Sequence, residues 1–198
     1  GVDTPRDEQG LCLIAAPRRL EQSETIVHEL PALLDSAMAH FDAIVANTGA
    51  NWGEQHAVLL ERSSRALFLV DQRASSLRAC KHAVELCARC GIAASPFLFV
   101  ANRCSKRSLF SSIDVSCAMQ GAHAAELKDG GVEVEQALGT GLAYDLVSSR
   151  NAFAQSVREL MGEVVGEAAG SLASSEESEA PSRGLFSFRR ARREGVLP

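Results

Sequence analysis

Apolar residues follow two patterns along this chain: short continuous runs, and longer stretches in which they recur at helical spacing. Each short run holds four to six residues and ends at a proline or a polar residue, which is typical of a strand buried on both faces. The expected strands of this kind are residues 11–16, 43–46, 66–70 and 96–101.

The longer stretches repeat apolar residues at intervals of three and four, which predicts amphipathic helices. Gly91, directly after one of them, is a typical C-terminal stop. The expected helices are residues 23–40, 54–62, 75–90 and 150–168, with shorter ones near 112–120 and at 132–138. A further short strand is expected near 122–127.

Apolar strands separated by helices indicate an α/β fold with a mainly parallel sheet and helices on both faces. A chain of 198 residues suffices for one such domain with a tail. We expect a leader or fragment edge at 1–9, since the chain has no initiator methionine, and the α/β domain at 10–168. Residues 169–198 are rich in Ser, Glu, Ala and Pro, which predicts a disordered tail.

The charge of the chain is distributed unevenly. The net formal charge is −5, yet residues 182–198 contain five arginines and only one glutamate, so the rest of the chain is more acidic than the total. Nucleic-acid binding requires a basic face for phosphate contacts, and we therefore expect no nucleic-acid partner.

The six cysteines suggest reduced thiols, because several lie within apolar runs and no secretory signal precedes them. Cys87 and Cys90 form a CxxC pair at the end of an expected helix, where the helix dipole opposes thiolate formation. Core packing is the favoured interpretation of the pair, with metal binding as the alternative. The five histidines are scattered, and we expect structural or surface roles for them.

Three expected strands end in a polar residue: Asn47, Asp71 and Asn102. Each residue alone could simply cap the next turn or helix. Together they predict a ligand crevice, because ligands of open parallel sheets bind outside the carboxyl ends of the strands. Trp52 falls in the loop after Asn47, either as a loop anchor or as part of a partner surface.

The segment Phe41–Gly49 resembles the "YDxVVxDTxP" segment of the MinD/ParA ATPases. Residues 67–72 with the helix start at 75–78 are similar to that family's next strand and helix, and 97–103 to its "vlNr" strand. In order, the similar segments cover roughly residues 10–167, and the CpaE/TadZ group, which positions the assembly machinery of Flp-type pili in bacteria, resembles the chain most. The resemblance implies ATP as cofactor, with Asn102 reading adenine.

By the same resemblance, the cofactor site also contains Arg103, Asn47 and Gly141. Gly141 belongs to the stretch 139–144, which the resemblance places beside the base of the nucleotide.

Two departures from the family's pattern argue against ATP hydrolysis. No GxxxxGK[ST] loop is present, and the only lysines, Lys81, Lys106 and Lys128, follow no glycine-rich loop. Asn47 also replaces the family's aspartate and lacks the charge that favours Mg²⁺. We therefore assign no catalytic residue and no metal ligand, and ATP is expected without firm Mg²⁺ binding.

The tail combines bulky apolar residues with clustered arginines: Leu185, Phe186, Phe188, Arg189 and Arg190. This pattern suits peripheral contact with an anionic membrane, and the alternative is a solvated basic terminus. A tail this short would need dimerisation for useful avidity. The expected location is the cytoplasm, with the inner face of the cell membrane or a cell pole as the place of peripheral contact.

The expected function is an atypical ATPase-like localisation or scaffold protein of Flp-type pilus or secretion assembly. It would act as a homodimer and bind assembly proteins. One alternative is an active positioning ATPase for division or cargo whose phosphate loop lies upstream of Gly1. Another is an interaction module that binds no nucleotide.

Overall fold

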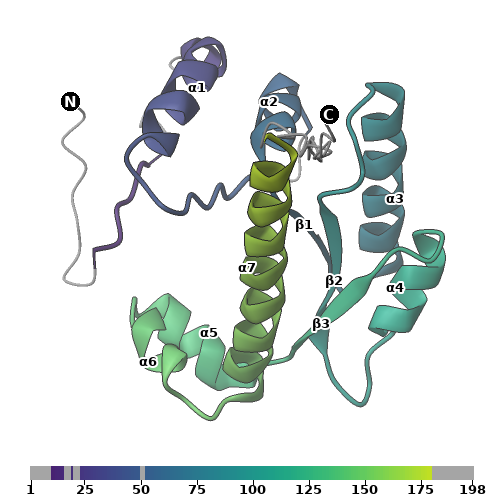
Figure 1. Cartoon of the computed structure of the whole chain (residues 1–198). Helices are drawn as coiled ribbons and strands as arrows, with labels where there is room; N and C mark the ends of the chain where they lie inside the picture. The colour runs from purple at the N-terminus through teal and green to yellow at the C-terminus, as the bar shows by residue number, and fades with distance from the viewer. Residues whose placement is uncertain (1–9, 16–18, 20–22, 50–51, 180–198) are drawn as a thin grey trace, which may run out of the picture.

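The computed structural model describes residues 10–15, 19, 23–49 and 52–179. Its sheet has three strands in the order β1 (Ala66–Val70), β2 (Phe97–Cys104) and β3 (Ala124–Lys128), with both pairs parallel. Parallel neighbours need a crossover, and helices supply it in both cases (Figure 1). The expected α/β class and parallel sheet are confirmed.

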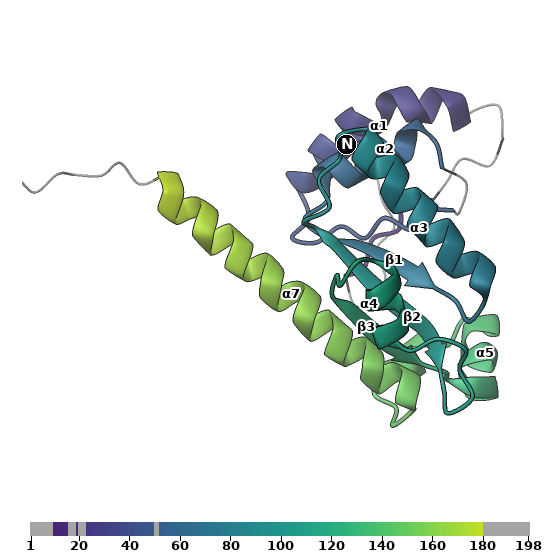
Figure 2. The ribbon, with the colours of Figure 1, turned by 90° about the vertical axis from the view of Figure 1, so that its right-hand side faces the viewer.

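Seven helices are assigned within the described residues: α1 (Ser23–Met38), α2 (Glu54–Arg62), α3 (Ala74–Arg89), α4 (Ser112–Ala118), α5 (Gly131–Gly139), α6 (Ala143–Val147) and α7 (Ala152–Glu179). Helices α3 and α4 cover one face of the sheet, and α7 crosses the other (Figures 1 and 2). None of the helices in the described part has a stretch long and apolar enough to cross a membrane.

The core lies on both sides of β2, the central strand. Phe97 and Phe99 point to the α3–α4 face, where they pack in one cluster with Val70, Cys87 and Val115. Leu98 and Val100 point the other way and pack against Leu127 of β3 and Leu160 of α7. Alternate residues of β2 are therefore buried on opposite faces, which explains its continuous apolar sequence.

Two expected strands are absent. Residues 43–46 form no strand, and in the run at 11–16 the described residues contribute a single bridge position, Cys12. Most apolar side chains among the described residues of these two runs stay at the surface, with Val45 90% exposed. A strand exists only where a neighbour pairs with its backbone, and a local apolar pattern does not supply that neighbour. The prediction of these two strands was wrong for this structure.

The other boundaries lie close to those predicted, with two differences near the C-terminus. Helix α6 was not expected, because five residues are too few for a periodic pattern. Helix α7 continues to Glu179, past the expected domain end at 168. Its later residues are mostly Ala, Glu and Ser, and a packed helix can extend through such residues at low cost.

Trp52 anchors the loop that precedes α2. Its ring stacks on His56 at a centroid distance of 5.0 Å and on Phe68 at 6.1 Å. His56 is buried; its Nδ1 accepts from the Gly53 N–H, and its Nε2 lies 3.2 Å from the Gly49 carbonyl oxygen. The imidazole therefore ties the loop to the first turn of α2. These contacts support the loop-anchor interpretation of Trp52 and a structural role for this histidine.

Candidate functional site

The carboxyl end of β1 forms a tight polar turn into α3. The Asp71 carboxylate accepts hydrogen bonds from Arg73 at 2.9 and 3.1 Å, and its backbone N–H donates to Ser76 Oγ. Asp71 is thus occupied by local contacts, as a turn-capping role would require. A carboxylate held in this way organises the turn between β1 and α3.

Gln72, the next residue, connects this turn to the end of β2. Its Nε2 donates to the carbonyl oxygens of Asn102 at 2.8 Å and Phe110 at 3.1 Å, while its Oε1 accepts from the Phe110 N–H at 2.9 Å. One side chain therefore satisfies three backbone groups of another loop. This role of Gln72 was not predicted from the sequence, although its position directly after a strand-end aspartate is a signal that could have indicated it.

A β-bulge interrupts the end of β2 at Asn102 and Arg103. Ala101 pairs with Glu126 and Cys104 pairs with Lys128, so β2 has one residue more than β3 over this interval. Arg103 has a φ of 56°, which is uncommon for a residue other than glycine. Bulges of this kind re-aim side chains and are frequent beside active sites.

The Asn102 carboxamide is half-buried and has no hydrogen-bond partner among the residues that the structure describes. The backbone of Asn102, in contrast, is held by Gln72 through its carbonyl oxygen. A side-chain amide with a fixed backbone and unused donors and acceptors can recognise a planar hydrogen-bonding ligand such as a base.

Arg103 links the bulge to α5. Its Nη2 donates to Glu135 Oε1 at 2.8 Å, with both side chains more than half exposed. Helix α5 ends in a turn where Gly141 has a φ of 75° and the Leu142 N–H donates to the Ala137 carbonyl oxygen. This positive φ is the left-handed conformation that favours glycine after a helix. The Arg103–Glu135 pair thus ties β2 to the helix that carries the Gly141 turn.

The structure therefore brings Asp71, Asn102 and Arg103 to one end of the sheet, and Gly141 lies in the turn after α5, the helix that Arg103 contacts through Glu135. Asn47 does not belong to this arrangement in the same way. It is exposed on the extended segment 41–49, outside every strand, because the expected strand at 43–46 is absent. The expectation of three consecutive strand ends thus holds for Asp71, which directly follows β1, and fails for Asn47. Asn102 lies within β2, two residues before its end at Cys104.

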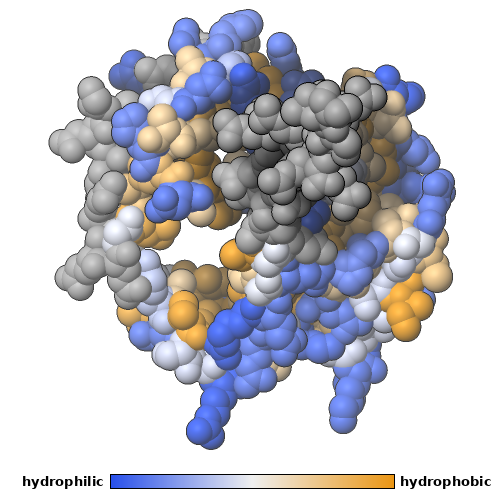
Figure 3. Space-filling view, in the orientation of Figure 1, coloured by the Kyte–Doolittle hydropathy of each residue, from blue (hydrophilic) through white to orange (hydrophobic). Residues whose placement is uncertain are grey.

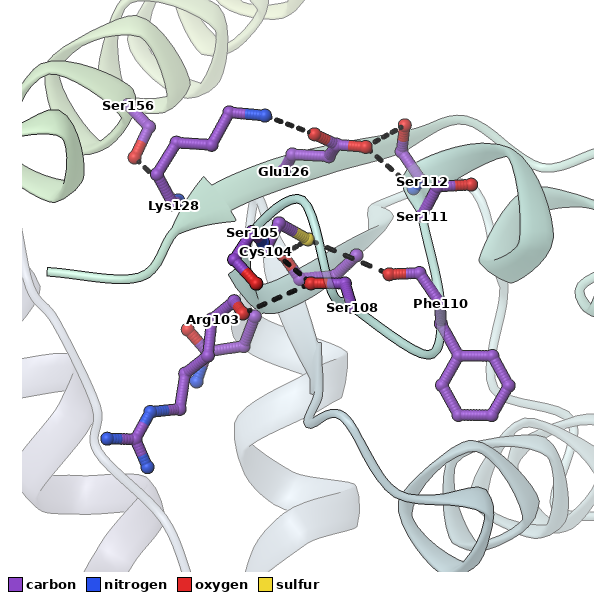
Figure 4. A network of polar contacts seen from close by, with 12 residues as sticks. Arg103, Cys104, Ser105, Ser108, Phe110, Ser111, Ser112, Glu126, Lys128 and Ser156 are labelled. Carbon is purple, nitrogen blue, oxygen red and sulfur yellow. Dashed lines mark hydrogen bonds and ion pairs between the residues drawn. The ribbon is translucent and has the colours of Figure 1, made fainter. Parts of the chain in front are cut away.

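A polar network supports the loop between β2 and α4 (Figure 4). Glu126 Oε1 accepts from the backbone N–H of Ser112 at 3.0 Å and from its hydroxyl at 3.1 Å, and Glu126 Oε2 accepts from Lys128. The hydrogen bond from Lys128 is the main cause that lowers the pKa of Glu126, and it raises the pKa of Lys128. The Ser156 hydroxyl accepts from the Lys128 N–H and so joins α7 to the same network.

The cysteines are free thiols in the described residues. Burial raises the pKa of Cys80 to about 11, so this thiol stays protonated and unreactive. Of the CxxC pair, Cys87 is a core residue at 1% exposure, which confirms core packing for it, whereas Cys90 is exposed and does not pack as expected. Nowhere in the described ranges do three His, Cys, Asp or Glu residues gather closely enough to hold a metal ion.

The tail residues expected to contact a membrane lie outside the described residues: Leu185, Phe186, Phe188, Arg189 and Arg190.

No protein-family model and no curated protein sequence matches this chain. Among solved structures, the chain is similar to a ParA family ATPase from Chlorobium tepidum TLS, with a TM-score of 0.66 and 18% sequence identity. The match covers 81% of this chain and 64% of that chain, so the present chain spans less than two thirds of the neighbour. Parallel strand order, crossover helices and this similarity together give one conclusion: the chain has a ParA-like α/β fold.

Proposed function

We propose that this protein is an ATPase-like localisation or scaffold protein of pilus or secretion assembly, similar to the CpaE/TadZ group. In this proposal ATP binding organises the protein, and hydrolysis is weak or absent. Homodimers would present the surface that assembly proteins bind, and the basic tail would add peripheral contact with the inner face of the cell membrane or a cell pole.

The observation that supports this proposal most is the unpaired carboxamide of Asn102. Gln72 holds the Asn102 backbone, and the bulge with Arg103 directs the chain toward α5. The carboxamide can donate to one adenine nitrogen and accept from the exocyclic amine, a bidentate pair that distinguishes adenine from guanine. The Gly141 turn, carried by α5, is the proposed second wall of the base site.

Two features favour weak or absent hydrolysis. The sequence has no glycine-rich loop with a lysine to hold the β- and γ-phosphates. At the position of the family's aspartate stands Asn47, a neutral side chain that contributes no charge to a Mg²⁺ site. A bound nucleotide would then act as a structural ligand that stabilises the folded form by mass action.

A second candidate is an active positioning ATPase for division or cargo. The ParA family ATPase neighbour favours it, because this chain spans only 64% of that structure and a phosphate loop could belong to the unmatched part. A glycine-rich loop with lysine upstream of Gly1, together with steady phosphate release by the full-length protein, would decide for this candidate.

The test is ATP binding by the full-length protein, measured by calorimetry for the wild type and for Asn102→Ala. Removing the bidentate pair should weaken ATP binding by about 1–3 kcal/mol. Asn102→Asp is the matched variant: it keeps the size of the side chain, removes its donor and should lose the preference for ATP over GTP. Unchanged ATP affinity in both variants would refute Asn102 as the base-reading residue.

A further inference from the structure

A groove is lined by residues of α3, the loop that precedes α4 and the last residue of α4, on the side of the sheet that these two helices cover. It has a volume of about 550 Å³. Its lining is divided by chemistry: Leu77, Phe110 and Ala118 supply apolar surface, while Arg78, Lys81 and His82 supply polar and cationic groups. None of these six side chains belongs to the proposed nucleotide site.

The cations of the groove are available to a partner. Arg78 and Lys81 lie three residues apart on α3, hence on neighbouring turns of one helical face, and both are exposed. Across the described ranges neither makes an ion pair. Glu85 is the one acidic residue of the lining and offsets one of the two cations, so the lining keeps a small positive formal charge in a chain whose net charge is −5.

The apolar part of the groove is firmly supported. Leu77 and Phe110 are half-buried and pack against the core cluster of β2 and α3, so they present fixed apolar surface. The backbone of Phe110 is also held on both sides by Gln72. Leu109, its neighbour in sequence, is 62% exposed and adds apolar area in the same loop.

We propose that this groove binds an acidic amphipathic helix of a partner protein. Apolar side chains of such a helix, spaced three and four residues apart, would enter along Leu77 and Phe110. Its carboxylates would meet Arg78 and Lys81, which steers association and sets orientation. Duplex nucleic acid fits the groove less well for two reasons. It offers no apolar side chains to the apolar part of the groove, and two cations without ion-pair partners provide few contacts to phosphates.

The experiment uses the whole chain and a synthetic peptide of about 18 residues, about 27 Å as a helix, with leucines on one face and glutamates on the other. Binding is followed by fluorescence anisotropy and mapped by NMR chemical-shift perturbation. Two control probes are a scrambled peptide of identical composition and a 20-base-pair DNA duplex. Saturable binding of the amphipathic peptide with shifts concentrated on α3, α4 and the 105–110 loop is the expected result.

Charge reversal supplies the decisive variants. Arg78→Glu with Lys81→Glu should weaken peptide binding by about tenfold or more, and raised salt should weaken binding to the wild type. The matched control is Arg89→Glu with Arg150→Glu, which changes the net charge equally at two exposed residues outside the groove and should leave binding within about twofold. Ala74→Glu, at the exposed start of α3, should also weaken binding without disturbing the core.

The proposal would be overturned by equal loss in both charge-reversed pairs, by shifts located away from the groove, or by tighter binding of DNA than of the peptide. Equal binding of the scrambled peptide would reduce the interaction to unspecific charge attraction and overturn it as well. Self-association that Arg78→Glu with Lys81→Glu abolishes would assign the groove to a second copy of this chain instead. Each of these outcomes is independent of ATP binding.

Discussion

Two parts of the same sheet differ in how completely they are covered. Leu67 of β1 and Leu98 of β2 are register partners and face the same side, yet Leu67 is 40% exposed and Leu98 only 4%. Helix α7 crosses this face over β2 and β3 and leaves β1 uncovered. The two leucines therefore bury different amounts of apolar surface and stabilise the fold to different extents, because a helix covers Leu98 and no helix covers Leu67.

The exposed side continues into the N-terminal part of the chain. Leu69 of β1, Val45 in the extended segment before α2, and Leu11 and Leu13 near the start are all more than half exposed. Figure 3 shows apolar surface around an opening beside α7, between this segment and the α5–α6 region. On this face of the sheet, the described fold is therefore stabilised mainly by β2, β3 and α7.

The largest expected effect tests this comparison directly with a matched pair. Leu98→Ala should lower the free energy of unfolding by about 2–5 kcal/mol, because it leaves a cavity between β2 and α7. Leu67→Ala removes the same atoms from a partly exposed site and should cost less than about 1 kcal/mol. Urea denaturation of both variants measures the two values. Equal losses would mean that the face of β1 is covered in solution.

The next effect concerns the connection between β1 and the loop after β2. Gln72→Ala leaves the Phe110 N–H and two carbonyl oxygens without their partner, at a cost of about 1–3 kcal/mol. Hydrogen exchange of the Phe110 amide should accelerate in the variant. Gln136→Ala on the exposed face of α5 is the control and should change stability by less than about 0.5 kcal/mol. An unchanged exchange rate of the Phe110 amide would contradict the conclusion that Gln72 holds the backbone of this loop.

A pH-dependent effect is expected at the α4–β3 network. Glu126 has a pKa below its ordinary value, so its contribution is complete above the unfolded pKa of about 4.3 and is lost as pH falls through the folded pKa. Near pH 7, Glu126→Gln should lower the free energy of unfolding by about 1 kcal/mol, a modest value because the side chain is partly exposed. Well below a pH of about 4.3, where Glu126 is protonated, the substitution should leave the free energy of unfolding unchanged. Denaturation curves at several pH values measure this difference. A constant difference across this range would contradict the assignment.

The smallest effect is expected in the segment that the pattern predicts as a strand. Val45→Asp changes a side chain that is 90% exposed and should alter stability by less than about 0.5 kcal/mol. A loss of more than about 1 kcal/mol in the free energy of unfolding would show that Val45 packs against the rest of the protein. That result would favour the strand that the sequence predicts at 43–46. The same denaturation assay as for Leu67→Ala gives the comparison on one scale.

The local pattern of apolar residues predicted those helices and strands whose own sequence shows which of their faces are buried. Helix α3 has an apolar stripe through Cys80, Ala83 and Cys87, and its predicted bounds differ from the observed ones by one residue at each end. β2 was predicted from its continuous apolar run, since burial on both faces leaves no place for alternation. The bulge was not predicted, because an extra residue in β2 depends on its register with β3.

The candidate site was predicted in part for the same reason. Asn102 and Asp71 were identified because a polar residue that ends a buried parallel strand lies at the carboxyl edge of the sheet. The contacts of Gln72 and the pairing of Arg103 with Glu135 could not be predicted, since each joins residues about thirty positions apart in the chain. Such contacts depend on how elements are packed, and residue types at one position do not specify them.

By itself, the sequence determined the α/β class, every described helix except α6, the three parallel strands and the position of Asn102, because side-chain period and burial are local consequences of residue order. Only the tertiary structure decided that the described residues of the runs at 11–16 and 43–46 stay outside the sheet and that Asn47 leaves the site. It also decided that α7 covers β2 but not β1. A strand requires a neighbouring strand that pairs with its backbone, and a buried face requires an element that covers it. The packing of the whole fold determines whether such a neighbour is present.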